Sequence, residues 1–115
     1  MQNKDNAVYV DKHKNIFLTK GNTAVFNLTI KKGGEVYDYS NDLVQLTIKK
    51  NIYTNKVLIQ KTFEFGSVKF VPDDTDNLDY GVYKYDIALT TPGGDFYTVI
   101  KEKDFNITGR VTENA

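Results

Sequence analysis

Apolar and polar residues alternate with a period of two in several segments of the chain. The clearest are residues 23–31 (TAVFNLTIK), 43–50 (LVQLTIKK) and 82–90 (VYKYDIALT). Such alternation is typical of a β-strand with one face on a core and the other towards solvent. No window of helical length carries an apolar stripe at the helical period. The pattern therefore predicts an all-β protein.

Shorter apolar runs extend this prediction, and turn signals such as KKGGE, FGS and TPGGD separate the runs. A short helical turn is expected near 73–79, where Pro72 ends a strand and Asp73 or Asp74 can cap the turn. Many short strands at close spacing favour an immunoglobulin-like antiparallel β-sandwich of about seven to nine strands. Besides the alternating segments, strands are expected at 15–19, 56–65, 67–71, 95–101 and 104–111.

Composition agrees with this fold class. Eight Tyr and seven Phe dominate the apolar set, and aromatic residues favour strands. A chain of 115 residues fits a single domain, 1–115, and we expect residues 1–6 and 112–115 to be loosely held.

The segment 77–90 (NLDYGVYKYDIALT) predicts a tyrosine corner. In an immunoglobulin-like sandwich, a Tyr near the start of strand F enters the core and its hydroxyl bonds to the backbone a few residues upstream. Here the spacing assigns this role to Tyr83, with Tyr85 two residues later. Asp79 and Gly81 would shape the turn, and Leu78 would close the core beneath it. The alternative, in which the two tyrosines form a ligand-stacking platform, is disfavoured because they alternate with polar residues.

Charge and cysteine content limit the classes of partner that we expect for this protein. Fifteen Lys and Arg balance fifteen Asp and Glu, so no basic face for nucleic acid is evident. The chain has no Cys, and neither a signal peptide nor a membrane span is visible. We therefore expect synthesis in a cytoplasm and no membrane or nucleic-acid partner.

No catalytic motif stands out, so we expect no enzyme and no cofactor. His13 is the only histidine and lies in a polar turn, which indicates a surface residue. The best metal candidate is a weak one for Ca²⁺, because four carboxylates occur close together without the spacing of an EF-hand. These residues are Asp73, Asp74, Asp76 and Asp79.

Some strands carry apolar residues on both faces, and such strands are usually covered on both. On strict alternation, the outer face of segments 82–91 and 95–101 would carry Val82, Ala88, Tyr97 and Val99. The cover could be the N-terminal arm at 7–10 or a neighbouring subunit. In either case the pattern indicates contact with protein.

Six short motifs follow one another along the chain: GNTAVF (21–26), KGGEVYD (32–38), VLIQKTF (57–63), PDDTDNL (72–78), GVYKYDI (81–87) and FNITGRVT (105–112). Together they resemble a family of tail and baseplate proteins from phages and prophages of Gram-positive bacteria, similar to the N-terminal domain of the baseplate upper protein. This chain has Asn22 at a position where an Asp is expected in this family. The resemblance implies an immunoglobulin-like structural or adaptor protein of the virion tail, with other tail proteins as partners and no catalytic residues.

A carbohydrate-binding module for cell-wall glycans is the alternative. Exposed tyrosines on loops could stack on sugars, although the Trp that such sites favour is absent. The sequence leaves open the partner, a possible homo-oligomer, the host, any glycan specificity, and whether this is a complete protein. The loop tyrosines are Tyr9, Tyr37, Tyr39, Tyr53 and Tyr80.

Overall fold

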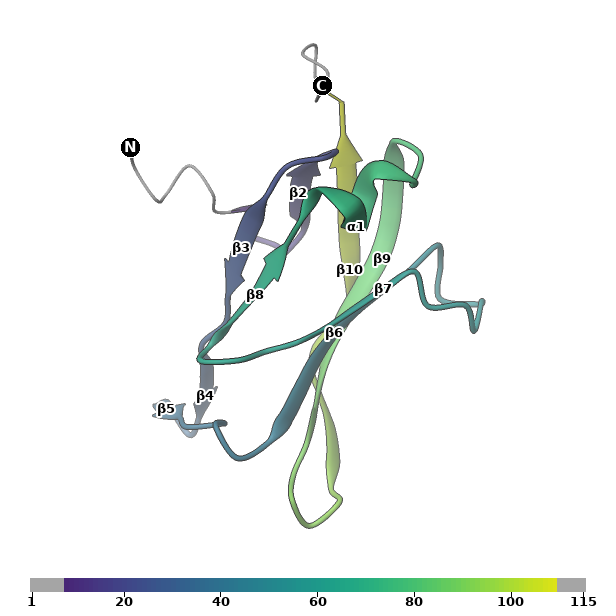
Figure 1. Ribbon diagram of the computed structural model, residues 1–115. Helices are drawn as coiled ribbons and strands as arrows, with labels where there is room; N and C mark the ends of the chain where they lie inside the picture. Colours follow the sequence, from purple (N-terminus) through teal and green to yellow (C-terminus); the bar gives the residue numbers. More distant parts are fainter. Residues whose placement is uncertain (1–7, 110–115) are drawn as a thin grey trace, which may run out of the picture.

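The computed structural model describes residues 8–109, and this part of the chain is all-β, as predicted (Figure 1). The predicted loose ends, 1–6 and 112–115, lie outside the described residues. The elements in chain order are β1 (Tyr9–Val10), β2 (Ile16–Thr19), β3 (Ala24–Asn27), β4 (Ile30–Lys32), β5 (Glu35–Tyr37), β6 (Leu43–Lys49), β7 (Ile59–Thr62), β8 (Ser67–Phe70), α1 (Pro72–Asp76), β9 (Gly81–Thr90) and β10 (Phe96–Thr108).

Six strands form one mixed sheet in the order β1-β2-β10-β9-β6-β7. β9 pairs antiparallel with both β6 and β10. β2 pairs with β10 in parallel, with Ile16 opposite Phe105. The expectation of a purely antiparallel architecture is therefore wrong at this pair. No hairpin joins β2 to β10, so their relative direction is not fixed as it is in a hairpin.

β3 and β8 form an antiparallel ribbon that makes a second layer (Figure 1). Phe70 of β8 packs on Phe105 of β10 with ring centroids 5.6 Å apart, so the core lies between ribbon and sheet. β4 and β5 form a separate hairpin. Within residues 8–109 the ribbon has two strands, fewer than a full immunoglobulin sheet. The immunoglobulin-like topology therefore stays a prediction.

The alternation predicts the core-facing residues of the central strands correctly. On β6 the side chains of Val44, Leu46 and Ile48 are buried, and on β9 those of Ile87 and Leu89. Segment 23–31, however, is not one strand. The ladder with β8 ends at Asn27, and the N–H of Leu28 donates to the carbonyl of Gly66 instead, at 2.9 Å. The chain then changes partner and pairs with β5 from Ile30 onwards.

Tyr83 makes the hydrogen bond that a tyrosine corner requires. Its side chain is 4% exposed, and its hydroxyl donates to the carbonyl oxygen of Asp79 at 2.8 Å. Gly81 has φ +145°, a conformation that favours glycine, and Leu78 packs against the core. Tyr85 is also buried, and its hydroxyl donates to the carbonyl of Lys14. Two buried rings cannot serve as a ligand-stacking platform, so that alternative is excluded.

The helical turn is α1, which is shorter and begins earlier than the predicted 73–79. Asp74 accepts the backbone N–H of Val71 at 2.8 Å and pairs with Lys61 at 2.9 Å. Thr75 is fully buried, and its hydroxyl oxygen accepts the N–H of Gly21 at 2.8 Å. These contacts connect the turn between β8 and β9 to the rest of the core.

Candidate functional site

The four residues predicted to form an outer docking face do not share one face of the sheet. Val82 and Ala88 do point away from the core, because they alternate with the buried residues of β9. Tyr97, however, lies opposite Leu89 and therefore shares the core-facing side. Val99 packs partly against the core. The predicted face is therefore wrong for Tyr97 and Val99.

A β-bulge explains this error. Thr98 pairs with Ala88 and Ile100 pairs with Ile87, so Val99 is an extra residue on β10. Strict alternation does not hold across such an insertion. A second register shift follows before Lys103, and through it β10 continues to Thr108. The two strands predicted at 95–101 and 104–111 are thus one.

The register identifies a different apolar row on the outer face. Leu43 of β6 pairs with Thr90 of β9, and Thr90 pairs with Phe96 of β10. Directly opposite residues point to the same side of a sheet. Leu43 is 47% exposed and Phe96 is 67% exposed. We name Leu43, Thr90 and Phe96 the outer row. Ala88 lies next to it, two residues from Thr90 along β9.

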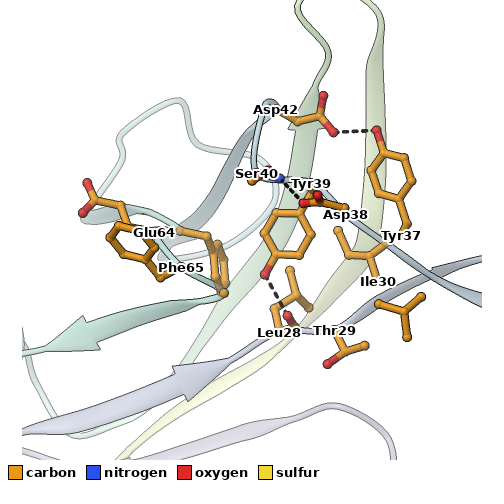
Figure 2. A pocket seen from close by; sticks show the side chains of 13 residues that line it. Leu28, Thr29, Ile30, Tyr37, Asp38, Tyr39, Ser40, Asp42, Glu64 and Phe65 are labelled. Atoms are coloured by element: carbon orange, nitrogen blue, oxygen red, sulfur yellow. Dashed lines mark hydrogen bonds between the residues drawn. The ribbon is translucent and has the colours of Figure 1, made fainter.

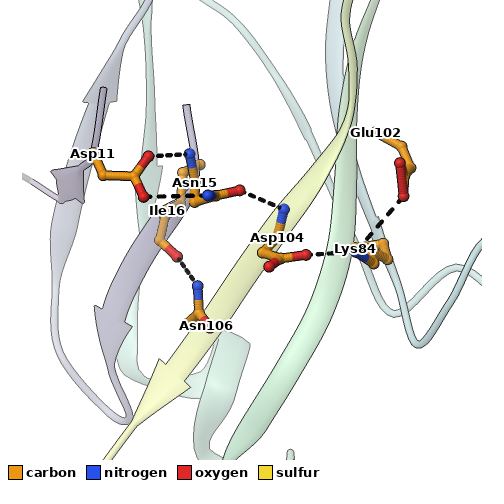
Figure 3. Close-up of polar contacts among 7 residues, drawn as sticks. All are labelled: Asp11, Asn15, Ile16, Lys84, Glu102, Asp104 and Asn106. Atoms are coloured by element: carbon orange, nitrogen blue, oxygen red, sulfur yellow. Dashed lines mark hydrogen bonds and ion pairs between the residues drawn. The ribbon is translucent and has the colours of Figure 1, made fainter. Parts of the chain in front are cut away.

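Charged residues separate Val82 from the outer row. Lys84 on β9 pairs with Asp104 and, at 3.6 Å, with Glu102 (Figure 3). Its hydrogen bond to Asp104 is the main reason that the pKa of Lys84 is raised. The outer face is therefore charged over its middle and exposes Leu43 and Phe96, beside threonines, near the β9–β10 turn.

A polar network joins β2 to the same part of β10. The side-chain oxygen of Asn15 accepts the N–H of Asp104 at 3.0 Å, and the amide of Asn106 donates to the carbonyl of Ile16 at 3.1 Å (Figure 3). Asp11 in turn accepts the backbone N–H of Asn15 at 2.9 Å. These bonds accompany the parallel pairing and show a structural role for this cluster.

A groove lies where the β4–β5 hairpin and the following loop meet the turn between β7 and β8. It has a volume of about 640 Å³, and most of its lining is apolar. Figure 2 shows Glu64 and Phe65 on one side and Tyr37 and Asp42 on the other, with Tyr39 between them. The lining residues are Leu28, Thr29, Ile30, Val36, Tyr37, Asp38, Tyr39, Ser40, Asp42, Phe63, Glu64, Phe65 and Gly66.

Hydrogen bonds hold the walls of the groove in place. The backbone carbonyl of Leu28 accepts the hydroxyl of Tyr39 at 2.7 Å. The backbone N–H of Leu28 donates to the carbonyl of Gly66, on the opposite wall. Tyr37 donates its hydroxyl to Asp42 at 2.6 Å, which is the main reason that the pKa of Tyr37 is raised. The groove is thus pre-formed from segments far apart in the sequence.

The turn at the edge of the groove is unusual. Glu64 and Ser67 exchange both backbone hydrogen bonds, so Phe65 and Gly66 form a two-residue hairpin loop. Both have positive φ, +54° for Phe65 and +84° for Gly66. Such a loop favours Asn-Gly or Gly-Gly. The ring of Phe65 is nevertheless fully exposed, at 106%. A residue that disfavours the turn and buries nothing is a candidate for function.

The structure does not bring the metal candidates together. Within residues 8–109 there is no group of three or more His, Cys, Asp or Glu side chains that could hold a metal ion. Asp74 bonds to Val71 and Lys61, and Asp79 contributes its carbonyl to Tyr83. The four aspartates therefore do not form the cluster that the weak Ca²⁺ prediction needs. His13 is exposed in the turn after β1, where its backbone N–H donates to the carboxylate of Asp11.

Of the five loop tyrosines, two meet at one site. Tyr37 and Tyr39 both line the groove. Tyr9 packs on Phe17 with ring centroids 5.5 Å apart, so the described part of the N-terminal arm lies at the β2 edge of the sheet. Lys20 lies over the ring of Tyr80, and Tyr53 is exposed in the loop after β6.

Sequence reasoning did not find the groove or Phe65. The segments that line the groove are distant in sequence, so no local sequence pattern marks the groove. The Phe-Gly pair at a two-residue turn was the one available signal, because Asn-Gly is expected there.

No family model, no curated protein and no solved structure matches the chain. Among the elements of residues 8–109, no helix is long and apolar enough to cross a membrane.

Proposed function

We propose that this protein is a non-enzymatic structural or adaptor protein of a phage or prophage tail, and that it acts by docking to other baseplate proteins in the virion. The observation that carries the proposal is the outer row. Leu43 and Phe96 expose large apolar side chains on the same face of the sheet, with Thr90 between them. Large apolar side chains exposed on one face are typical of contact with another protein.

The resemblance of the motifs at 21–26, 72–78 and 81–87 to tail proteins supplies the biological setting of the proposal. A docking role needs a rigid scaffold, and the outer row lies on hydrogen-bonded strands of the main sheet. Docking also needs no cleft lined by ionisable groups.

Mass spectrometry of purified tail particles from a phage that encodes the chain tests the setting. We expect the protein in stoichiometric amounts. The double variant Leu43→Glu/Phe96→Glu tests the surface, because two charges on the outer row should prevent incorporation without unfolding the sheet. Tyr53→Glu is the matched control, since Tyr53 is even more exposed, at 88%, but lies on a separate loop. Absence of the protein from the particles, or normal incorporation of the double variant, would contradict the proposal.

Carbohydrate binding is the second candidate. It is favoured by Tyr37 and Tyr39, which meet in the groove beside carboxylates that can accept sugar hydroxyls. Titration of the intrinsic tyrosine fluorescence with cell-wall polysaccharide tests it. A saturable change that Tyr37→Ala removes would support this candidate over docking alone.

A further inference from the structure

The groove offers negative charge without a matching cation. Three carboxylates line it, those of Asp38, Asp42 and Glu64. No Lys or Arg belongs to the lining, as far as residues 8–109 are concerned, and none of the three carboxylates takes part in an ion pair found there. Lys32 lies 5.9 Å from the centroid of the Tyr37 ring, outside the lining, so it can offset one charge at most.

Hydrogen bonds orient two of these carboxylates, those of Asp38 and Asp42. The backbone N–H of Ser40 donates to Asp38 at 2.9 Å, and this bond lowers the pKa of Asp38. Asp42 accepts the hydroxyl of Tyr37 through one oxygen, and the hydrogen bonds found within the described residues leave its other oxygen free for a donor. A ligand that brings a cation therefore meets fixed acceptors.

The rest of the lining is apolar and aromatic. Leu28, Ile30 and Val36 line the groove together with the ring of Phe65, which stands exposed at its edge. Aliphatic chains pack on such a surface, and a guanidinium or ammonium is attracted to an aromatic face. The combination suits a side chain with an apolar stem and a positive end.

We propose that the groove docks a polypeptide segment of a partner protein that presents an arginine or lysine flanked by apolar side chains, with Phe65 as the packing surface. This inference rests on the proposed docking function but uses a surface other than the outer row. Two copies of this chain would not dock groove to groove, because their carboxylates would then oppose one another. A neutral sugar would leave the negative charges unmatched.

The test is a titration of ¹⁵N-labelled protein, observed by NMR, with the peptide acetyl-Leu-Arg-Leu-amide. A peptide with citrulline in place of arginine has the same shape without the charge. We expect amide shifts confined to the groove, a weaker effect of the citrulline peptide, and weakening by added salt. In the double variant Asp38→Asn/Glu64→Gln, affinity should fall by about threefold or more, in the range of exposed ion pairs.

Two further variants sharpen the outcome. Phe65→Asn fits the turn and removes the ring, so it should weaken binding in a folded protein. Glu35→Gln removes a nearby charge outside the lining and should leave affinity unchanged. Equal shifts with both peptides, no groove shifts at all, or groove shifts with the N-acetylglucosamine disaccharide alone would overturn the inference. None of these results affects the outer-row test, because Leu43 and Phe96 do not line the groove.

Discussion

Two tyrosines on β9 show how single residues hold this fold together. Tyr83 and Tyr85 are both buried, and each hydroxyl donates to a backbone carbonyl outside the sheet, at Asp79 and Lys14 respectively. A buried hydroxyl needs such a partner, because an unpaired one costs free energy. The phenol groups therefore fix the paths of two loops against the core.

The first prediction concerns the corner. Tyr83→Phe removes the bond to the carbonyl of Asp79 and keeps the ring, so the free energy of unfolding should fall by about 1 kcal/mol. Urea denaturation measures it. Tyr80→Phe is the control, because Tyr80 is exposed and Lys20 can lie over either ring. Equal losses in the two variants would contradict a specific role for the corner hydroxyl.

The second prediction concerns alkaline pH. Burial, with a smaller contribution from the charge of Asp11, raises the pKa of Tyr85 to about 12 from a model-compound value of 10.0. Above pH 10 the unfolded chain loses this proton while the folded chain keeps it, so stability falls as pH rises towards the folded-state pKa. Urea denaturation at a series of pH values above 9 should show a shallower fall for Tyr85→Phe. The same slope in both proteins would count against this assignment.

At the scale of elements, the bulges and the changes of partner were harder to predict than the strands. Alternation identifies the buried sides of β6 and β9, since both strands pair regularly. It fails on β10, where Val99 is inserted and residues 102–103 are expected to separate two strands. The ladder instead resumes at Lys103, opposite Tyr85, and the side chain of Asp104 pairs with Lys84. Such outcomes depend on the neighbouring strand, which local sequence does not specify.

The third prediction concerns the turn between β7 and β8. Phe65→Asn should raise the free energy of unfolding by up to about 1 kcal/mol, because Asn tolerates positive φ better than Phe and Asn-Gly suits a two-residue loop. Phe65→Ala is the matched control. It removes the same ring but keeps an unfavourable conformation, so no gain is expected. A less stable Asn variant would mean that the exposed ring supports the fold.

At the scale of the whole molecule, the outer row and the groove lie near each other. The outer row lies near the β9–β10 turn, and Leu43 of this row directly follows Asp42 of the groove along the chain. The sequence predicts an apolar surface on β9 and β10 but not its residues, because the bulge at Val99 changes which residues face outward. It does not predict the groove, because three separate segments of the chain assemble it. The opposite end of β9 instead carries the corner and α1.

The last prediction concerns how stability is distributed over the molecule. β9 is hydrogen-bonded to strands on both sides and buries every second side chain, whereas β4 and β5 form a separate hairpin with mostly exposed residues. Hydrogen exchange followed by NMR should therefore be slowest at the amides of β9 and β6 and fastest, among paired amides, in β4 and β5. Local opening of this hairpin would remodel one wall of the groove without unfolding the core. Addition of the arginine peptide should then slow exchange in β4 and β5 and leave β9 unchanged. Equal protection of the hairpin and β9 before peptide is added would show that the groove wall opens only with the whole fold.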